Sequence, residues 1–135
     1  PEGEVVVNAL APCFGDERML RQVFVNLLSN AFKFSSHKVK RVIEIGCVEQ
    51  TNENIYFVKD NGAGFDMHYK YRLFNVFQRL HSHEEFGGTG MGLAIVKRII
   101  SLHGGTVRAE GKPDAGATFY VTLPRLSEKL QTYNL

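Results

Sequence analysis

The sequence predicts an α/β (α+β) two-layer sandwich in which about three helices cover one face of a mixed sheet of about five strands. Two observations support this prediction. First, five segments have strand-like apolar residues: one stands alone and the other four form two consecutive pairs. Second, amphipathic helical segments separate the single segment from the first pair and the first pair from the second. The resulting order is strand, helix, two strands, a long irregular segment, helix and two strands, without an internal repeat. This order differs from that of a doubly wound Rossmann sheet.

The N-terminal half is expected to form a strand, a helix and a hairpin. The β-branched run at residues 4–8 reads as an edge strand. Asp16 is suited to cap a helix that runs to about Phe34. The alternating segments 41–48 and 55–60 are joined by a polar turn and predict an antiparallel hairpin.

The C-terminal half begins with residues 61–90, where glycines, histidines and aromatics surround at most one or two short helices. An irregular segment of this length is typical of a functional loop and predicts a mobile lid. Helical periodicity returns over residues 91–103, and Gly104 is suited to a left-handed C-cap. Residues 106–110 and 117–123 predict a second hairpin.

The composition predicts one globular domain over residues 1–124, followed by a polar tail at 125–135. The chain has 135 residues, of which 44% are hydrophobic and 22% charged. A formal net charge of +2 with scattered basic residues argues against a nucleic-acid surface. No apolar run reaches about 18 residues, so we expect no membrane contact by this domain. The absence of an initial Met suggests a fragment of a longer protein.

Two cysteines, Cys13 and Cys47, lack a metal-binding spacing and indicate a reduced, intracellular setting. The five histidines, at positions 37, 68, 81, 83 and 103, are expected to lie on the surface or in the lid. None of them has the helical His-Glu or His-Asp context of a phosphoacceptor.

The first helix carries a polar stripe on which Asn26 and Asn30 lie one turn apart, between Gln22 and Lys33. Such amides could be ordinary surface groups. Alternatively, a neutral amide oxygen can ligate Mg²⁺ held by nucleotide phosphates, and a lysine suits phosphate, whereas an amide cannot act as a general base. The neighbouring face, expected to pack on the sheet, consists of Leu20, Val23, Leu27, Ala31 and Phe34.

Two glycine-containing segments could surround a nucleotide. Asp60 is fixed at the end of a strand, where a buried carboxylate suits the exocyclic amino group of adenine, although Asp-Asn-Gly could equally form a simple hairpin turn. The glycines of residues 87–92 run into a helix and could bring backbone N–H groups to phosphate. They lack the ending of a Walker loop. Between the two segments, Phe74 and Phe77 could anchor the chain while Arg79 reaches a phosphate.

Taken in order, these segments resemble the N, G1, F and G2 boxes of the GHKL ATPase superfamily, which has the Bergerat fold. The resemblance extends over residues 10–124 and is closest to the catalytic ATP-binding domain (HATPase_c) of sensor histidine kinases. Residues 77–81, with Glu85, Phe86 and the following glycines, are most similar to the bacteriophytochrome-type sensors.

The resemblance implies a role for each matching residue. Asn30 would ligate Mg²⁺ and Asn26 would lie at the phosphates, while Lys33 and Arg79 would contact phosphate and, with Asn30, carry the catalysis. Phe34 stands where the family often has tyrosine, and so offers no hydroxyl. The base pocket would be formed by Asp60, Gly62, Gly64, Phe65 and Thr118. The lid hinge and phosphate cradle would be formed by Gly88, Thr89, Gly90, Gly92 and Leu93.

The resemblance further implies that the domain binds Mg-ATP and donates the γ-phosphoryl group to a histidine on an upstream dimerisation domain, from which a response regulator receiver domain is phosphorylated. We expect the isolated domain to be a cytoplasmic monomer. One alternative is a non-catalytic nucleotide-binding module. A water-directed ATPase is disfavoured, because Asn26 stands where the hydrolytic relatives have a glutamate base.

Overall fold

The computed structural model describes residues 2–74 and 92–125, apart from the side chains of residues 2 and 69–71. The strands are β1 (Glu2–Val7), β2 (Lys40–Glu49), β3 (Glu53–Asp60), β4 (Thr106–Lys112) and β5 (Gly116–Pro124). The helices are α1 (Glu17–Phe34), α3 (Gly92–Leu102) and a 3-10 helix, Met67–Arg72. The predicted polar tail beyond residue 125 lies outside this range.

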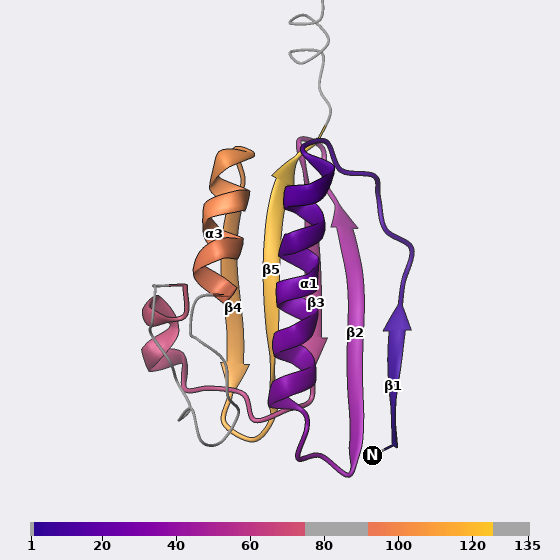
Figure 1. Cartoon of the computed structure of the whole chain (residues 1–135), viewed down its shortest axis with the longest axis vertical. Helices are drawn as coiled ribbons and strands as arrows, with labels where there is room; N and C mark the ends of the chain where they lie inside the picture. The colour runs from indigo at the N-terminus through magenta and orange to yellow at the C-terminus, as the bar shows by residue number, and fades with distance from the viewer. Residues whose placement is uncertain (1, 75–91, 126–135) are drawn as a thin grey trace, which may run out of the picture.

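One mixed sheet contains all five strands in the order β1-β2-β3-β5-β4 (Figure 1). Strand β1 runs parallel to β2 at one edge, and every other neighbouring pair is antiparallel. The predicted edge strand and both predicted hairpins are therefore confirmed. The second hairpin is longer than expected, because pairing continues to Lys112 opposite Gly116.

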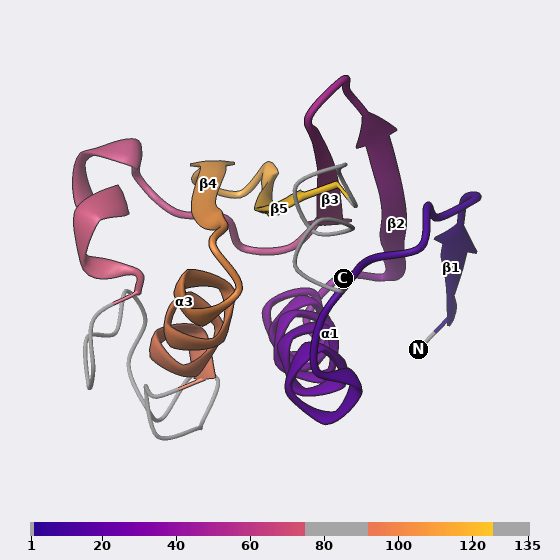
Figure 2. The same cartoon turned by 90° about the horizontal axis from the view of Figure 1, so that it is seen from above.

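Both α-helices of the described chain cover the same face of the sheet, as Figure 2 shows. Helix α1 lies over the middle strands and α3 over β4 (Figure 1). The apolar positions of α1 recur at helical spacing and are buried, which contributes about 1.5–3 kcal/mol for each large side chain. Four of the five predicted positions are buried, and the fifth, Phe34, is half-buried. No helix in the described part of the chain is long and apolar enough to cross a membrane.

The beginning of α1 is tied to the end of α3. Asp16 caps α1 as predicted, since its carboxylate accepts the backbone N–H of Met19 at 3.0 Å. The backbone N–H of Asp16 donates to Nε2 of His103 at 3.0 Å, while Nδ1 of His103 lies 2.8 Å from the Ile99 carbonyl oxygen. His103, which was expected at the surface, is half-buried and contacts both helices. Gly104, at φ 76°, provides the predicted left-handed C-cap.

The end of α1 is held by groups outside the helix. The last carbonyl groups of any helix lack intrahelical partners. In α1 the carbonyl oxygens of residues 31–34 accept hydrogen bonds from, in order, Ser35, Arg41, Ser36 and Ala63. Arg41 belongs to β2 and Ala63 to the loop after β3, so this end of α1 is fixed to the sheet at two places.

Candidate functional site

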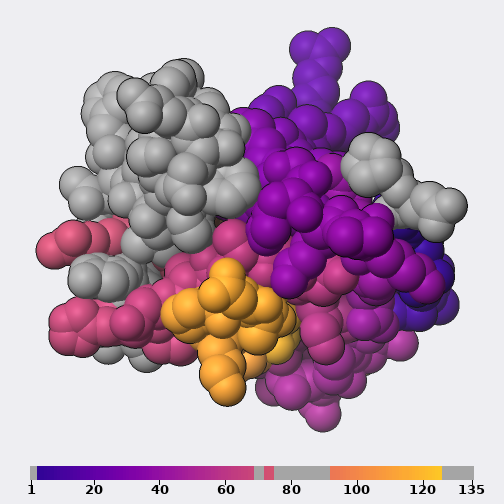
Figure 3. Space-filling model, turned by 90° about the horizontal axis from the view of Figure 1, so that it is seen from below, coloured from indigo at the N-terminus to yellow at the C-terminus, as the bar shows by residue number. Residues whose placement is uncertain are grey.

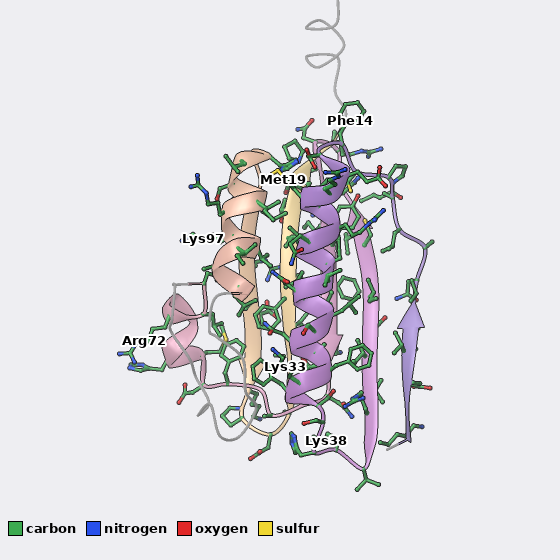
Figure 4. All side chains as sticks on the ribbon, in the orientation of Figure 1. Phe14, Met19, Lys33, Lys38, Arg72 and Lys97 are labelled. Atoms are coloured by element: carbon green, nitrogen blue, oxygen red, sulfur yellow. The ribbon has the colours of Figure 1, made fainter. Side chains whose placement is uncertain are left out.

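The polar stripe of α1 faces α3. The side-chain amide of Asn26 donates through Nδ2 to the carbonyl oxygen of Gly92, the first residue of α3, at 3.2 Å. Asn30 lies one helical turn further toward the end of α1, and Lys33 lies on the lower part of the helix in Figure 4. The loop after β3 reaches the same end of α1, because the Ala63 N–H donates to the Phe34 carbonyl at 2.8 Å. The structure thus brings the two predicted halves of the site together.

The two asparagines have different environments. Both polar atoms of the Asn26 amide are used within the protein, since Oδ1 accepts from Gln22 Nε2 at 2.8 Å and Nδ2 binds Gly92. Asn30 is half-buried, and its amide has no hydrogen-bond partner in the described part of the chain. Asn26 therefore links α1 to α3, whereas Asn30 keeps a carbonyl oxygen available to a ligand.

Asn30 fits a magnesium ion that is held mainly by its nucleotide. Within residues 2–74 and 92–125, no group of three or more histidine, cysteine or acidic side chains could hold a metal. A single neutral amide oxygen is a weak site alone, but Mg²⁺ commonly keeps its waters and binds substrate phosphates with one or two protein ligands.

Asp60 is the clearest polar feature of the interior. It is the last residue of β3, and strand alternation places it on the helix-facing side with Tyr56 and Val58. Its side chain is 3% exposed. Oδ1 accepts the backbone N–H of Gly62 at 2.8 Å, while the buried Oδ2 has no partner in the described part of the protein. A buried acceptor left unpaired costs about 1–3 kcal/mol, so Oδ2 suits a ligand that brings a donor.

Burial also changes the acidity of this group. Desolvation raises the pKa of the Asp60 carboxyl above its ordinary value of 3.8. The hydrogen bond from the Gly62 N–H lowers it in part, as does the nearby Ala117 N–H, which forms no hydrogen bond with Oδ2. The folded chain therefore holds a proton at pH values where the unfolded chain has lost it. It follows that the free energy of unfolding contributed by Asp60 falls as the pH rises from 3.8 through the folded pKa.

We expect Asp60→Asn to stabilise the nucleotide-free chain at neutral pH, because a neutral amide costs less to bury than a carboxylate. Denaturant unfolding of both chains at about pH 4.5 and about pH 7 would measure this. The stability advantage of the variant should be larger at the higher pH. An advantage that stays constant or shrinks with rising pH would contradict the raised pKa.

Three glycines allow the backbone around Asp60 to pack closely against the end of α1 and the β4–β5 turn. A Cβ on Gly62 would lie 2.1 Å from the carbonyl oxygen of Phe34, and one on Gly64 would lie 2.0 Å from that of Lys112. A Cβ on Gly116 would meet the Asp60 carbonyl oxygen at 2.1 Å. Figure 3 shows this end of the molecule, where the β4–β5 turn lies against the segment after β3. These glycines therefore allow close contact between protein backbones, and so hold Asp60 in place.

Alanine substitutions at Gly64 and Gly92 test whether close backbone packing is the reason for glycine at position 64. Gly64 has a φ of 65°, where a side chain is strained, and Gly64→Ala should destabilise the fold by about 2–4 kcal/mol. A Cβ on Gly92 meets nothing within 4 Å in the described residues, so Gly92→Ala should change stability by less than about 1 kcal/mol. Thermal unfolding of both variants measures the contrast, and equal losses would refute it.

Phe65 and Leu93 contribute to the core beside the site. Phe65 is 5% exposed, and its ring centroid lies 6.4 Å from that of Phe119. Leu93 is half-buried against the same core. Core packing is therefore the observed role of both residues. Their contacts with a ligand stay predictions.

The structure does not bring Thr118 into the site. Thr118 pairs with Lys59 on one side and Glu110 on the other, and both of these neighbours are exposed. Because successive residues of a strand point to opposite faces, Thr118 lies on the sheet face away from the helices. The residue of β5 that pairs with Asp60 is Ala117, which is buried.

Several predicted residues lie outside the described residues. These are Arg79 and the glycine segment with Gly88, Thr89 and Gly90, together with the predicted lid histidines at positions 81 and 83. Their roles remain predictions.

Sequence reasoning missed the importance of Arg41 and Ser35. In the sequence Arg41 is one of three basic residues close together, with Lys38 and Lys40. In the structure its Nε donates to Ser35 Oγ at 3.0 Å, and its guanidinium lies 5.0 Å from the centre of the Phe32 ring. Ser35 is fully buried. No local pattern distinguishes either residue, because both interactions depend on how β2 passes the end of α1.

The mixed five-stranded sheet, the helix layer of the described residues and a buried aspartate beside an asparagine-bearing helix are the features expected of a GHKL-type domain. Residues 15–127 match the family described as histidine kinase-, DNA gyrase B- and HSP90-like ATPases. The chain belongs to this family.

Its relatives include phytochrome proteins and circadian input-output histidine kinases. The chain is 41% identical over 121 residues to phytochrome-like protein Cph1 of Synechocystis sp., covering 90% of this chain and 16% of that protein. It is 47% identical over 105 residues to cyanobacterial phytochrome A of Nostoc sp., covering 78% of this chain and 14% of that protein. The chain thus spans under a fifth of the length of these relatives. The predicted similarity to phytochrome-type sensors is confirmed.

Solved structures of sensor kinases share the fold. The mycobacterial sensor histidine kinase MprB superposes with a TM-score of 0.77 at 28% identity, covering 93% of this chain and 85% of that one. Full-length ShkA in complex with AMPPNP superposes with a TM-score of 0.72 at 27% identity, covering 93% of this chain and 26% of that one. The predicted sandwich fold is therefore confirmed.

Proposed function

We propose that this chain binds Mg-ATP and donates the γ-phosphoryl group to a histidine on a separate dimerisation and phosphoacceptor domain. The observation that carries the proposal is the buried Oδ2 of Asp60, an acceptor without a partner in the described residues and suited to the adenine amino group. Relatives that are named as histidine kinases, and a similar structure in complex with AMPPNP, support it.

Each residue has a limited chemical task in this proposal. Asp60 orients the base by accepting from its amino group, and Asn30 offers its amide oxygen to the metal. Lys33 and the N-terminal end of α3 place positive charge near the phosphates. Bound Mg²⁺ supplies charge neutralisation on the phosphates during transfer. Arg79 and the residue 88–90 glycines would complete the phosphate contacts, as the family resemblance implies.

The Asn26 environment favours transfer to histidine over hydrolysis. An amide cannot remove a proton from water, and the Asn26 amide is already engaged with Gln22 and Gly92. A neutral imidazole is itself a nucleophile near pH 7 and needs no strong base. The acceptor would therefore be a protein histidine that belongs to another domain. A cytoplasmic location and the domain limits at residues 1–124 form part of the same proposal.

The proposal is tested by incubating the chain with Mg²⁺, labelled ATP and its cognate helical acceptor fragment, and by measuring acid-labile phosphohistidine on the acceptor. Phosphohistidine that depends on the chain supports the kinase. Tight Mg-ATP binding without any transfer would favour the non-catalytic module. Rapid release of phosphate without acceptor would favour an ATPase.

A further inference from the structure

Asn61 follows the last residue of β3, and its side chain continues the hydrogen bonding between β3 and β2. Its Oδ1 accepts the backbone N–H of Val42 at 2.9 Å, and its Nδ2 donates to the carbonyl oxygen of Lys40 at 2.9 Å. Its own backbone N–H donates to the Val42 carbonyl at 3.2 Å. The side-chain amide thus binds β2 much as a peptide group of a longer strand would. The main chain of the loop is thereby free to leave the sheet after Asp60.

This side-chain pairing fixes the turn that holds the Asp60 carboxylate. Asn61 is the middle residue of the turn in which the Gly62 N–H donates to Asp60 Oδ1 at 2.8 Å. The next residue, Ala63, is bound to the end of α1 through the Phe34 carbonyl. With both sides of the turn fixed, Oδ1 is kept on the Gly62 N–H, and this determines the direction of Oδ2.

We propose that Asn61 is a positioning residue that sets the selectivity of this site for a purine carrying an exocyclic amino group. Asn61 acts through Asp60 and does not itself contact the nucleotide, because both ends of its amide are occupied by β2. This inference rests on the proposed function, since it assumes that Oδ2 of Asp60 accepts from the base.

The experiment compares two ligands that differ only at that amino group. ATP and purine riboside triphosphate, in which hydrogen replaces the amino group, are titrated by calorimetry at fixed Mg²⁺ into the wild-type chain and Asn61→Ala. The wild-type chain should prefer ATP by about tenfold or more. In Asn61→Ala this preference should fall at least about threefold, because ATP loses affinity and the analogue does not.

Tyr56→Phe is the matched control. It removes one hydrogen bond, from the Tyr56 hydroxyl to the Ala11 carbonyl at 2.7 Å, on the same strand but away from Asp60. A structural loss alone would weaken both ligands equally, so Tyr56→Phe should keep the wild-type preference for ATP.

Three outcomes separate this inference from the proposed function. A wild-type chain that binds neither ligand, or binds both equally, would remove Asp60 from base recognition and overturn both proposals. A wild-type preference that survives in Asn61→Ala would overturn only the role of Asn61. If Asn61→Ala does not fold, Asn61→Asp carries the test, because it keeps the acceptor for Val42 and loses the donor to Lys40. That variant should show an intermediate preference, and an unchanged one refutes the inference.

Discussion

Asp60→Asn should weaken ATP binding about 10- to 100-fold, which corresponds to about 1–3 kcal/mol. The substituted side chain can still accept the Gly62 N–H, so the turn should survive. Its amide nitrogen, however, would replace Oδ2 and set one donor against another at the adenine amino group. Isothermal titration calorimetry with Mg-ATP gives the affinity directly.

Asp66→Asn provides the control, since Asp66 is an exposed carboxylate whose hydrogen bond in the described residues is to the N–H of His68, at the start of the 3-10 helix. Its affinity should equal that of the wild-type chain. The effects of Asp60→Asn on binding and on nucleotide-free stability should have opposite signs, which distinguishes lost recognition from a damaged fold. Undiminished ATP affinity would remove Asp60 from the base pocket.

Asn30→Asp should lower phosphoryl transfer by about 100-fold or more while changing Mg-ATP affinity much less. A carboxylate can still bind the metal, but it adds a negative charge beside the phosphates and draws the ion from its productive position. Because the Asn30 amide has no partner in the described residues, the fold should tolerate the change. Transfer is measured as phosphohistidine on the acceptor fragment, and affinity by calorimetry.

Ser29→Ala is the neighbouring control on α1. Ser29 is exposed, and as the residue before Asn30 its side chain points about 100° away from that of Asn30 around the helix, so both transfer and affinity should remain at wild-type levels. If Asn30→Asp transferred phosphate at the wild-type rate, Asn30 would not be the magnesium ligand. If affinity and transfer fell by the same factor, Asn30 would act in binding and not in the transfer step.

Local periodicity predicted most of the fold. The buried face of α1 follows from its 3.6-residue repeat, and Asp16 was identifiable because a carboxylate before an amphipathic run satisfies free N–H groups. Both hairpins followed from alternation and turn residues. Strand ends were less predictable, since the partner strand decides how far pairing continues, as it does at Lys112 and Gly116.

Candidate site residues could be chosen from the sequence only where the residue type itself limits the possible chemistry. The burial of Asp60 at the end of β3 agrees with the sequence, while the ligand roles of Asp60 and Asn30 stay predictions. Thr118 shows the limit, since a shift of one residue along β5 moves a side chain to the other face of the sheet. The pairing of Ala117 with Asp60 depends on strand register, which no local pattern specified.

The hydrogen bonds of His103 and Asn26 link α1 to α3 at opposite ends of α3, and they differ in length. At the far end, His103 accepts from Asp16 at 3.0 Å and is itself anchored to α3 through Ile99. At the Gly92 end of α3, the described hydrogen bond between the helices is the one of 3.2 Å from Asn26 to Gly92. In addition to the buried apolar face of α3, the hydrogen bonds at its C-terminal end therefore tie it to α1 more closely than the one at its N-terminal end. Under the proposed function, a phosphate that took over the Asn26 amide would break one hydrogen bond of 3.2 Å between the helices and leave those of His103 in place.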